Sequence, residues 1–109
     1  MEIRTVDEEK WASMSLMEQM ANIGSEVGRT RKWLMKGNPQ LSEGAFLRCL
    51  DLIDVTIRTG RRNATSRSCL LKELCRARDL FAESFLEIDM DNLLFLEKYF
   101  GQFAMAVRR

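Results

Sequence analysis

Apolar residues recur at steps of three and four along most of the chain, and no segment shows the strict alternation typical of a half-buried strand. This spacing puts apolar side chains on one face of a helix, so it predicts four amphipathic helices. The connections between them are short, which favours antiparallel neighbours. The predicted fold is all-α: an antiparallel up-down-up-down four-helix bundle over 13–109, with helices at about 16–36, 43–59, 66–87 and 92–108, preceded by an acidic N-terminal tail or short extra helix over 1–12.

Residues that begin and end helices lie between the apolar stripes. Ser15 and Glu18 have the spacing of a capping box at the start of the first helix. Gly37 suits the left-handed position just after that helix, and Asn38-Pro39 is expected to lie beyond it. For the later helices we expect an N-cap at Ser42, a stop at Gly60, an N-cap at Thr65 or Ser66, and an N-cap at Asp89 or Asp91.

The chain contains no histidine, which excludes whole classes of chemistry. One copy cannot assemble a Ser-His-Asp or Cys-His nucleophile, a histidine-ligated zinc or haem site, or a histidine pH switch. There is no C-x-x-C, phosphate loop or dinucleotide-binding glycine motif either. We therefore expect no enzyme activity, no catalytic residue, no metal or other cofactor and no small-molecule substrate. Catalysis by Asp, Glu or Lys alone is the enzyme hypothesis that stays open.

Cysteine usage and the N-terminus point to a reducing compartment. Cys49, Cys69 and Cys75 lie in apolar segments and are predicted to be reduced thiols that pack as small hydrophobic side chains. The N-terminus is acidic and does not resemble a signal peptide. No apolar run approaches the roughly 20 residues that span a bilayer. We expect a soluble, cytoplasmic protein that does not contact a membrane.

The net charge of +1 conceals an uneven distribution of charge. Residues 29–78 contain twelve basic and four acidic side chains, whereas residues 1–28 and 79–109 are both acidic on balance. In an antiparallel bundle much of this positive charge meets at one end. This arginine-rich pole is predicted to contain Arg58, Arg61, Arg62, Arg67, Lys72, Arg108 and Arg109.

Two interpretations of the arginine-rich pole are open. Arginine forms bidentate contacts with phosphate and carboxylate, so the pole could bind RNA, DNA or an acidic protein partner. A solvated charge cluster that complements helix dipoles needs no ligand at all. The acidic tail could also fold back onto this end of the bundle.

The remaining charges are expected to neutralise one another. Asp54 with Arg58, and Arg48 with Asp51, have the spacing of ion pairs on a helix surface. At the end of the bundle opposite the pole, we expect the basic residues Arg29, Arg31, Lys32 and Lys36 to be compensated by Asp79, Glu83 and Glu87.

The first helix contains a possible oligomer interface. Small residues there either allow close packing inside the bundle or admit a second copy or partner. Methionines near Trp11 form an adaptable apolar strip, which is usually core but would be a contact surface if exposed. The candidate interface residues are Met14, Met17, Met20, Ala21, Gly24 and Gly28.

Four sequence blocks carry a family resemblance: MSLMEQMANIGSEVGRTRKWLMKGN, AFLRCLDLIDVTI, LLKELCRARDLF and YFGQFAMAVR. Their order resembles a group of small prokaryotic four-helix proteins of unknown function, with IGSEV, AF-R-L-L-D-T, KEL-R-R and YF-FA-AR blocks. The resemblance covers most of 14–109 and implies a helical bundle without an assigned activity. The architecture is more loosely similar to the accessory proteins of diversity-generating retroelements, which bind RNA, and to HEPN bundles. Active HEPN ribonucleases need a histidine that this chain lacks.

The leading functional hypothesis is a non-enzymatic accessory or assembly protein that contacts nucleic acid or an acidic partner through the arginine-rich pole. The alternative is a protein–protein interaction or homo-oligomerisation module with no nucleic-acid role.

Overall fold

The structure, a computed structural model, describes residues 7–62 and 68–107. Within these ranges all regular secondary structure is α-helical, which confirms the predicted all-α class. The caps expected at Thr65 or Ser66 lie outside the described residues. The helices are α1 (Glu8–Ala12), α2 (Leu16–Met35), α3 (Pro39–Arg62), α4 (Ser68–Glu87) and α5 (Met90–Val107).

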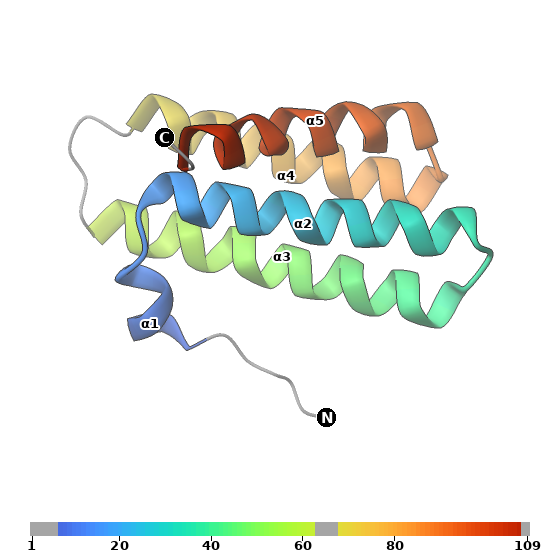
Figure 1. The fold of residues 1–109 in the computed structure, drawn as a ribbon, viewed down its shortest axis with the longest axis horizontal. Coiled ribbons are helices and arrows are strands. Elements are labelled where there is room, and N and C mark those ends of the chain that lie inside the picture. Colours follow the sequence, from blue (N-terminus) through green and yellow to red (C-terminus); the bar gives the residue numbers. More distant parts are fainter. Residues whose placement is uncertain (1–6, 63–67, 108–109) are drawn as a thin grey trace.

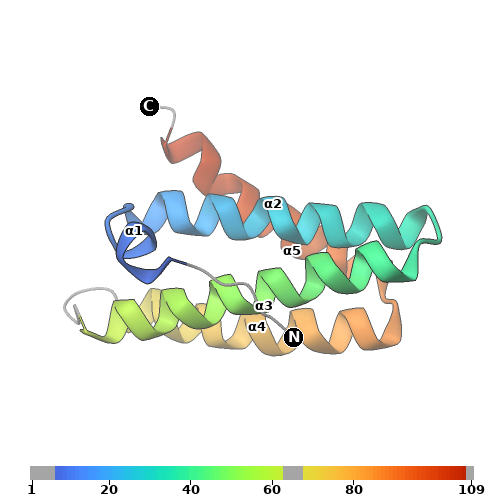
Figure 2. The same ribbon diagram turned by 90° about the horizontal axis from the view of Figure 1, so that it is seen from below.

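The four long helices lie side by side. α2 packs against α3 and α5, and α4 packs against the same two helices. Figure 1 shows α2 and α4 running in one direction while α3 and α5 return in the other. Seen from below in Figure 2, α5 diverges from α4 towards its C-terminal end. The two helices are therefore closest near the short connection between them.

The predicted apolar stripes form the core between the long helices. Met20, Ile23 and Val27 of α2 are fully buried, and so are Leu74 and Phe81 of α4. Burying each large apolar side chain stabilises the fold by about 1.5–3 kcal/mol. From α3 and α5 the core includes Phe46, Cys49, Ile53, Leu93, Leu96 and Phe100.

The caps of α2 follow the sequence prediction. The Ser15 hydroxyl accepts from the Glu18 backbone N–H at 3.1 Å, and the Glu18 carboxylate accepts from the Ser15 N–H at 2.9 Å, which completes the capping box. At the other end Gly37 has φ +70°, in the left-handed region. The Gly37 and Asn38 N–H groups then donate to carbonyls in the last turn of α2, as in a Schellman motif.

The start of α3 corrects the sequence prediction. The helix begins at Pro39 rather than after Ser42, because proline is well suited to the first helical position, where no N–H bond is needed. The cap is Asn38, whose Oδ1 accepts from the Leu41 N–H at 3.0 Å. Ser42 is buried inside the helix and donates its hydroxyl to the Pro39 carbonyl. The expected N-cap role of Ser42 is therefore wrong.

Gly60 does not end α3, which continues to Arg62. Gly60 is buried, and a Cβ added there would lie 2.8 Å from Leu71 Cδ2 of α4. This glycine therefore lies where α3 and α4 pack closely, with the Leu71 side chain against it, and not in a turn.

The connection between α4 and α5 is short and tightly bonded. Ile88 follows α4 with φ 53°, a left-handed conformation that is strained for a β-branched residue. Asp89 then caps α5 as expected, because its Oδ1 accepts from the Asn92 N–H at 3.1 Å. The alternative cap, Asp91, lies within the first turn of α5.

Residues 8–12 form the short extra helix rather than a free tail. The Trp11 side chain of α1 is buried, and its indole N–H donates to Thr56 Oγ1 of α3 at 2.8 Å. The Gln19 amide donates to the Trp11 carbonyl at 2.7 Å, which joins α1 to α2 as well. α1 is therefore anchored to α2 and α3 by a buried side chain and two buried hydrogen bonds.

Candidate nucleic-acid interface

The residues predicted for the arginine-rich pole are described only in part. Arg58 near the end of α3 and Lys72 in the first half of α4 are both exposed. Arg61 and Arg62 belong to the last turn of α3, and Arg67, Arg108 and Arg109 lie outside the described residues. Figure 1 shows the C-terminal end of α3, the N-terminal end of α4 and the C-terminal end of α5 at the same end of the molecule, next to α1.

Acidic α1 contributes a counter-charge at this end. Arg58 Nη2 donates to Glu8 Oε2 at 2.7 Å, and this hydrogen bond raises the pKa of Arg58. Asp54 and Arg58, which were expected to pair with each other within α3, pair with residues of other helices instead. Asp54 accepts from Arg78 Nε of α4 at 2.6 Å, and Arg58 donates to Glu8 of α1. The sequence left open whether the acidic N-terminal segment folds back onto the pole. Glu8 does so, because it pairs with Arg58.

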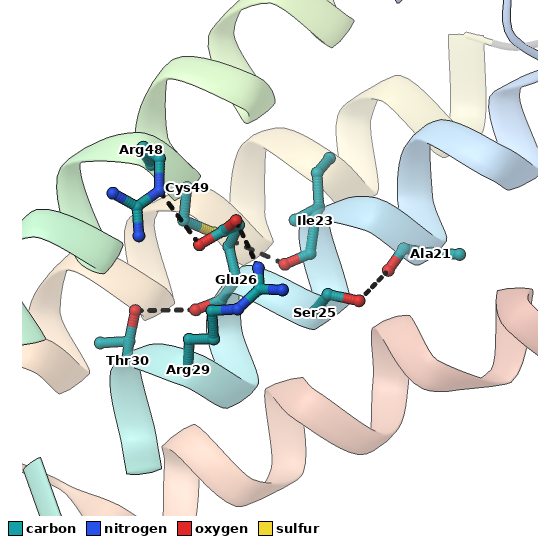
Figure 3. A network of polar contacts seen from close by, with 8 residues as sticks. All are labelled: Ala21, Ile23, Ser25, Glu26, Arg29, Thr30, Arg48 and Cys49. Atoms are coloured by element: carbon teal, nitrogen blue, oxygen red, sulfur yellow. Dashed lines mark hydrogen bonds and ion pairs between the residues drawn. The ribbon is translucent and has the colours of Figure 1, made fainter. Parts of the chain in front are cut away.

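A second basic cluster surrounds Glu26, between α2 and α3 (Figure 3). Glu26 Oε2 accepts from Arg29 Nη1 at 2.7 Å, and its Oε1 lies 3.4 Å from Arg48 Nε, which replaces the local pair expected between Arg48 and Asp51. The Glu26 side chain is only 13% exposed, whereas those of Arg29 and Arg48 are 55% and 59% exposed. A largely buried carboxylate thus holds two guanidinium groups at the surface.

The Cys49 thiol lies beside this carboxylate (Figure 3) and donates to the Ile23 carbonyl at 3.7 Å. Burial, and then the negative charge of Glu26, raise the pKa of the Cys49 thiol. The thiol therefore stays protonated, and the thiolate that a nucleophile needs is disfavoured. Cys49 packs as predicted, but Cys69 is exposed and Cys75 half-buried, because they occupy outer positions of α4.

Two lysines flank a tryptophan at the C-terminal end of α2. Lys32 Nζ and Lys36 Nζ lie 5.2 and 5.5 Å from the centroid of the Trp33 ring. Trp33 is half-buried and both lysines are exposed. Each cation–π contact contributes about 0.5–1 kcal/mol at an exposed site. The indole ring therefore positions two ammonium groups that point to solvent.

Direct ion pairs do not provide the expected neutralisation of this end. Among the described residues no ion pair joins the basic residues of α2 to Asp79, Glu83 or Glu87, because α2 packs against α3 and α5 rather than α4. Arg31 is paired instead with Glu97 of α5, to which its Nε donates at 2.7 Å. We use the name basic face for three residues at the C-terminal end of α2 and one on α3: Arg29, Lys32, Lys36 and Arg48.

The basic face is the surface that sequence reasoning missed. Its members belong to the basic segment 29–78, so the charge count contained the signal. The partner of each acidic residue, however, depends on which helices pack together. In the folded chain Glu26 is shared by two arginines, and Lys32 and Lys36 face an aromatic ring instead of a carboxylate.

The residues of the possible oligomer interface do not share one surface. Met20 is fully buried, and Gly24 is buried where a Cβ would lie 2.8 Å from Phe100 Cβ of α5. A Cβ at Gly28 would lie 3.0 Å from a carboxylate oxygen of Glu97. Close packing within one chain therefore explains Gly24, whereas the neighbour of Gly28 is the end of a flexible glutamate side chain. Met14 and Ala21 are half-buried, and Met17 is 38% exposed.

No protein-family model, curated protein or solved structure matches the chain. The resemblance of the four sequence blocks therefore stays a prediction. Across 7–62 and 68–107, the Cys, Asp and Glu side chains form no group of three or more that could hold a metal ion. In the same ranges no helix combines the length and apolar character that crossing a membrane requires.

Proposed function

We propose that this chain is a non-enzymatic, cytoplasmic accessory module that binds nucleic acid, built as an antiparallel up-down-up-down four-helix bundle. The observation that carries the proposal is the basic face, where four exposed cations lie on the adjacent helices α2 and α3, and two of them are paired with the largely buried carboxylate of Glu26. Clustered lysine and arginine side chains bind the phosphate backbone and release its counterions.

The local contacts prepare these cations for phosphate. Glu26 Oε2 accepts from Arg29 and its Oε1 forms an ion pair with Arg48, while the side chains of both arginines stay more than half exposed to solvent. Trp33 similarly restrains Lys32 and Lys36. Side chains that are already restrained lose less conformational entropy when they bind a ligand. Contacts to backbone phosphate position a protein on nucleic acid without reading the bases, so we expect weak sequence preference.

The arginine-rich pole is the second part of the proposed interface. Among its described members, Arg58 is paired with Glu8, so α1 competes with phosphate at that position. On α3, Trp11 and Glu8 of α1 contact Thr56 and Arg58, which lie towards the opposite end of the helix from Arg48 of the basic face. We therefore assign the larger share of binding to the basic face.

The test is fluorescence anisotropy with labelled single-stranded RNA and duplex DNA over a range of salt concentrations. Two variants each remove two cations: Lys32→Ala with Lys36→Ala on the basic face, and Arg61→Ala with Arg62→Ala at the pole. We expect the first to weaken binding by about tenfold at low salt and to reduce the salt slope by roughly 1.5–2. The second should have a smaller effect.

Two outcomes would contradict this assignment. Loss of binding only in the pole variant would move the interface back to the arginine-rich pole. A wild-type protein that binds neither RNA nor DNA at low salt would overturn the nucleic-acid function altogether. In that case the alternative, a protein-interaction module with no nucleic-acid role, is favoured by the exposed apolar residues of α5.

A further inference from the structure

An open apolar cleft lies between α4 and α5, whereas the basic face lies on α2 and α3. Lys72, at one end of the cleft, also belongs to the arginine-rich pole. The cleft has a volume of about 370 Å³ and is lined by Arg76, Ala77 and Leu80 of α4 and by Phe95, Leu96 and Tyr99 of α5. The cleft exists because α5 diverges from α4 while following α2 (Figure 2). One hydrogen bond spans it, from the Tyr99 hydroxyl to Glu73 Oε1 at 2.7 Å.

The walls of the cleft leave a large aromatic side chain in solvent. Phe95 is 60% exposed although it lies beside buried Leu96. Leu80 on the opposite wall is half-buried. An exposed aromatic ring beside an apolar cleft is typical of a contact surface, because covering it removes apolar area from water.

Most exposed charged residues around the cleft are sorted by sign along the two helices, and the exception is Glu73, a carboxylate at the basic end that accepts the Tyr99 hydrogen bond. Since α4 and α5 are antiparallel and Glu73 contacts Tyr99, Lys98 lies at the same end of the cleft as Lys72 and Arg76. The other end of the cleft is acidic, because Asp91 starts α5 close to the acidic last turns of α4. All of these side chains are exposed: Lys72, Arg76 and Lys98 at the basic end, and Asp79, Glu83 and Asp91 at the acidic end.

This pattern is complementary to itself. When two copies face each other across a two-fold axis, the basic end of one meets the acidic end of the other, and the apolar centres coincide. A polyanion would be repelled by the acidic end. Any partner surface whose charges all have the same sign would be repelled by one end or the other. We propose that the α4–α5 face is a homodimer interface with a second, antiparallel copy of this chain, in which Phe95 of each copy lies near the axis.

The size of the face predicts a weak dimer. A helix of 20 residues is about 30 Å long and about 10 Å wide, so two helices present on the order of 600 Å² per copy. That area is at the low end for specific protein–protein contacts. We therefore expect a dimer that dissociates on dilution.

Charge exchange between two variants tests the interface. Lys72→Glu with Arg76→Glu makes the face predominantly acidic and leaves Lys98 as a cation, whereas Asp79→Lys with Glu83→Lys makes it predominantly basic and leaves Asp91 as a carboxylate. Each variant alone should self-associate at least ~10-fold more weakly than the wild type, because like charges then meet at both ends. An equimolar mixture of the two variants should form a heterodimer. Sedimentation velocity in the presence of a reductant measures all of these states without disulfides through exposed Cys69.

The matched control is Lys32→Glu with Lys36→Glu, which changes charge equally on the basic face. It should leave dimerisation intact while abolishing nucleic-acid binding. A failure of the dimer proposal is therefore distinguishable from a failure of the nucleic-acid proposal. Far-ultraviolet circular dichroism checks that each variant is folded. A wild-type chain that is monomeric at the highest attainable concentration overturns the proposal, and so does a mixture of the two variants that does not associate.

Discussion

α5 makes two contacts that differ in closeness. Against α2 its backbone approaches so near that Gly24 has no room for a Cβ, and Phe100 is fully buried there. Against α4 the same helix leaves a cleft, and Phe95 is 60% exposed. Gly24 lets α5 pack closely on α2, and the direction that α5 then takes leads it away from α4.

The largest expected effect compares the two phenylalanines of α5. Phe100→Ala removes a fully buried ring and should lower the free energy of unfolding by about 3–5 kcal/mol. Phe95→Ala removes an exposed ring and should change it by no more than about 0.5 kcal/mol. Urea unfolding at low protein concentration, where the chain is monomeric, measures both values. Equal losses in the two variants would show that the cleft is closed in solution.

A smaller effect tests the glycine that allows the close contact. Gly24→Ala should destabilise the chain by about 1 kcal/mol, because overpacking against Phe100 costs about 1–3 kcal/mol and alanine returns about 1 kcal/mol of helix propensity. The control is Gly101→Ala, on an open part of α5, which should stabilise the helix by up to about 1 kcal/mol. Thermal unfolding of the pair compares the two sites. Stabilisation by both substitutions would mean that α5 can move away from α2 at little cost.

The smallest effect concerns the hydrogen bond across the open contact. Burial, and then the hydrogen bond to Glu73, raise the pKa of Tyr99 above its ordinary value of 10.0. The folded chain therefore binds the phenolic proton more tightly than the unfolded chain does. Tyr99 contributes its full stabilisation below pH 10.0, and this contribution is lost as the pH rises through the folded pKa.

Tyr99→Phe should therefore lessen the loss of stability above pH 10.0, which urea unfolding on both sides of that pH measures. Tyr99 is the single tyrosine of the chain, so the near-ultraviolet absorbance of its phenolate reports its titration directly. An ordinary pKa in the folded protein would show that the bond to Glu73 does not persist and that the cleft is more open still.

Local signals in the sequence were enough to predict the fold class and several helix ends. The capping box at Ser15 and Glu18, the left-handed glycine at Gly37 and the cap at Asp89 each depend on residues within one turn of one another. The predicted N-cap at Ser42 and the predicted helix end at Gly60 are wrong for different reasons. Asn38 and Pro39 form a better helix start close by in the sequence, whereas Gly60 packs against Leu71 of another helix and does not form a turn.

The partners of charged residues could not be predicted from spacing. Arg58, Arg48 and Asp54 all have suitable partners within one helical turn, yet their observed partners are on other helices. Contacts between helices bring together groups that are far apart in the chain, and a charge count does not indicate which pairs form. The sequence predicted the binding site at the arginine-rich pole, much of which lies outside the described residues. The structure instead favours the basic face on α2 and α3 as the candidate site.

By itself the sequence determined that the chain is all-helical, because periodic apolar stripes and helix caps depend on neighbouring residues. It also determined that histidine chemistry is excluded and that positive charge is concentrated in the middle of the chain. Only the tertiary structure decided that Glu26 is shared by two arginines, that Glu8 covers Arg58, and that α5 diverges from α4. These outcomes depend on how closely whole helices approach, which is set by side chains that meet only when the chain has folded.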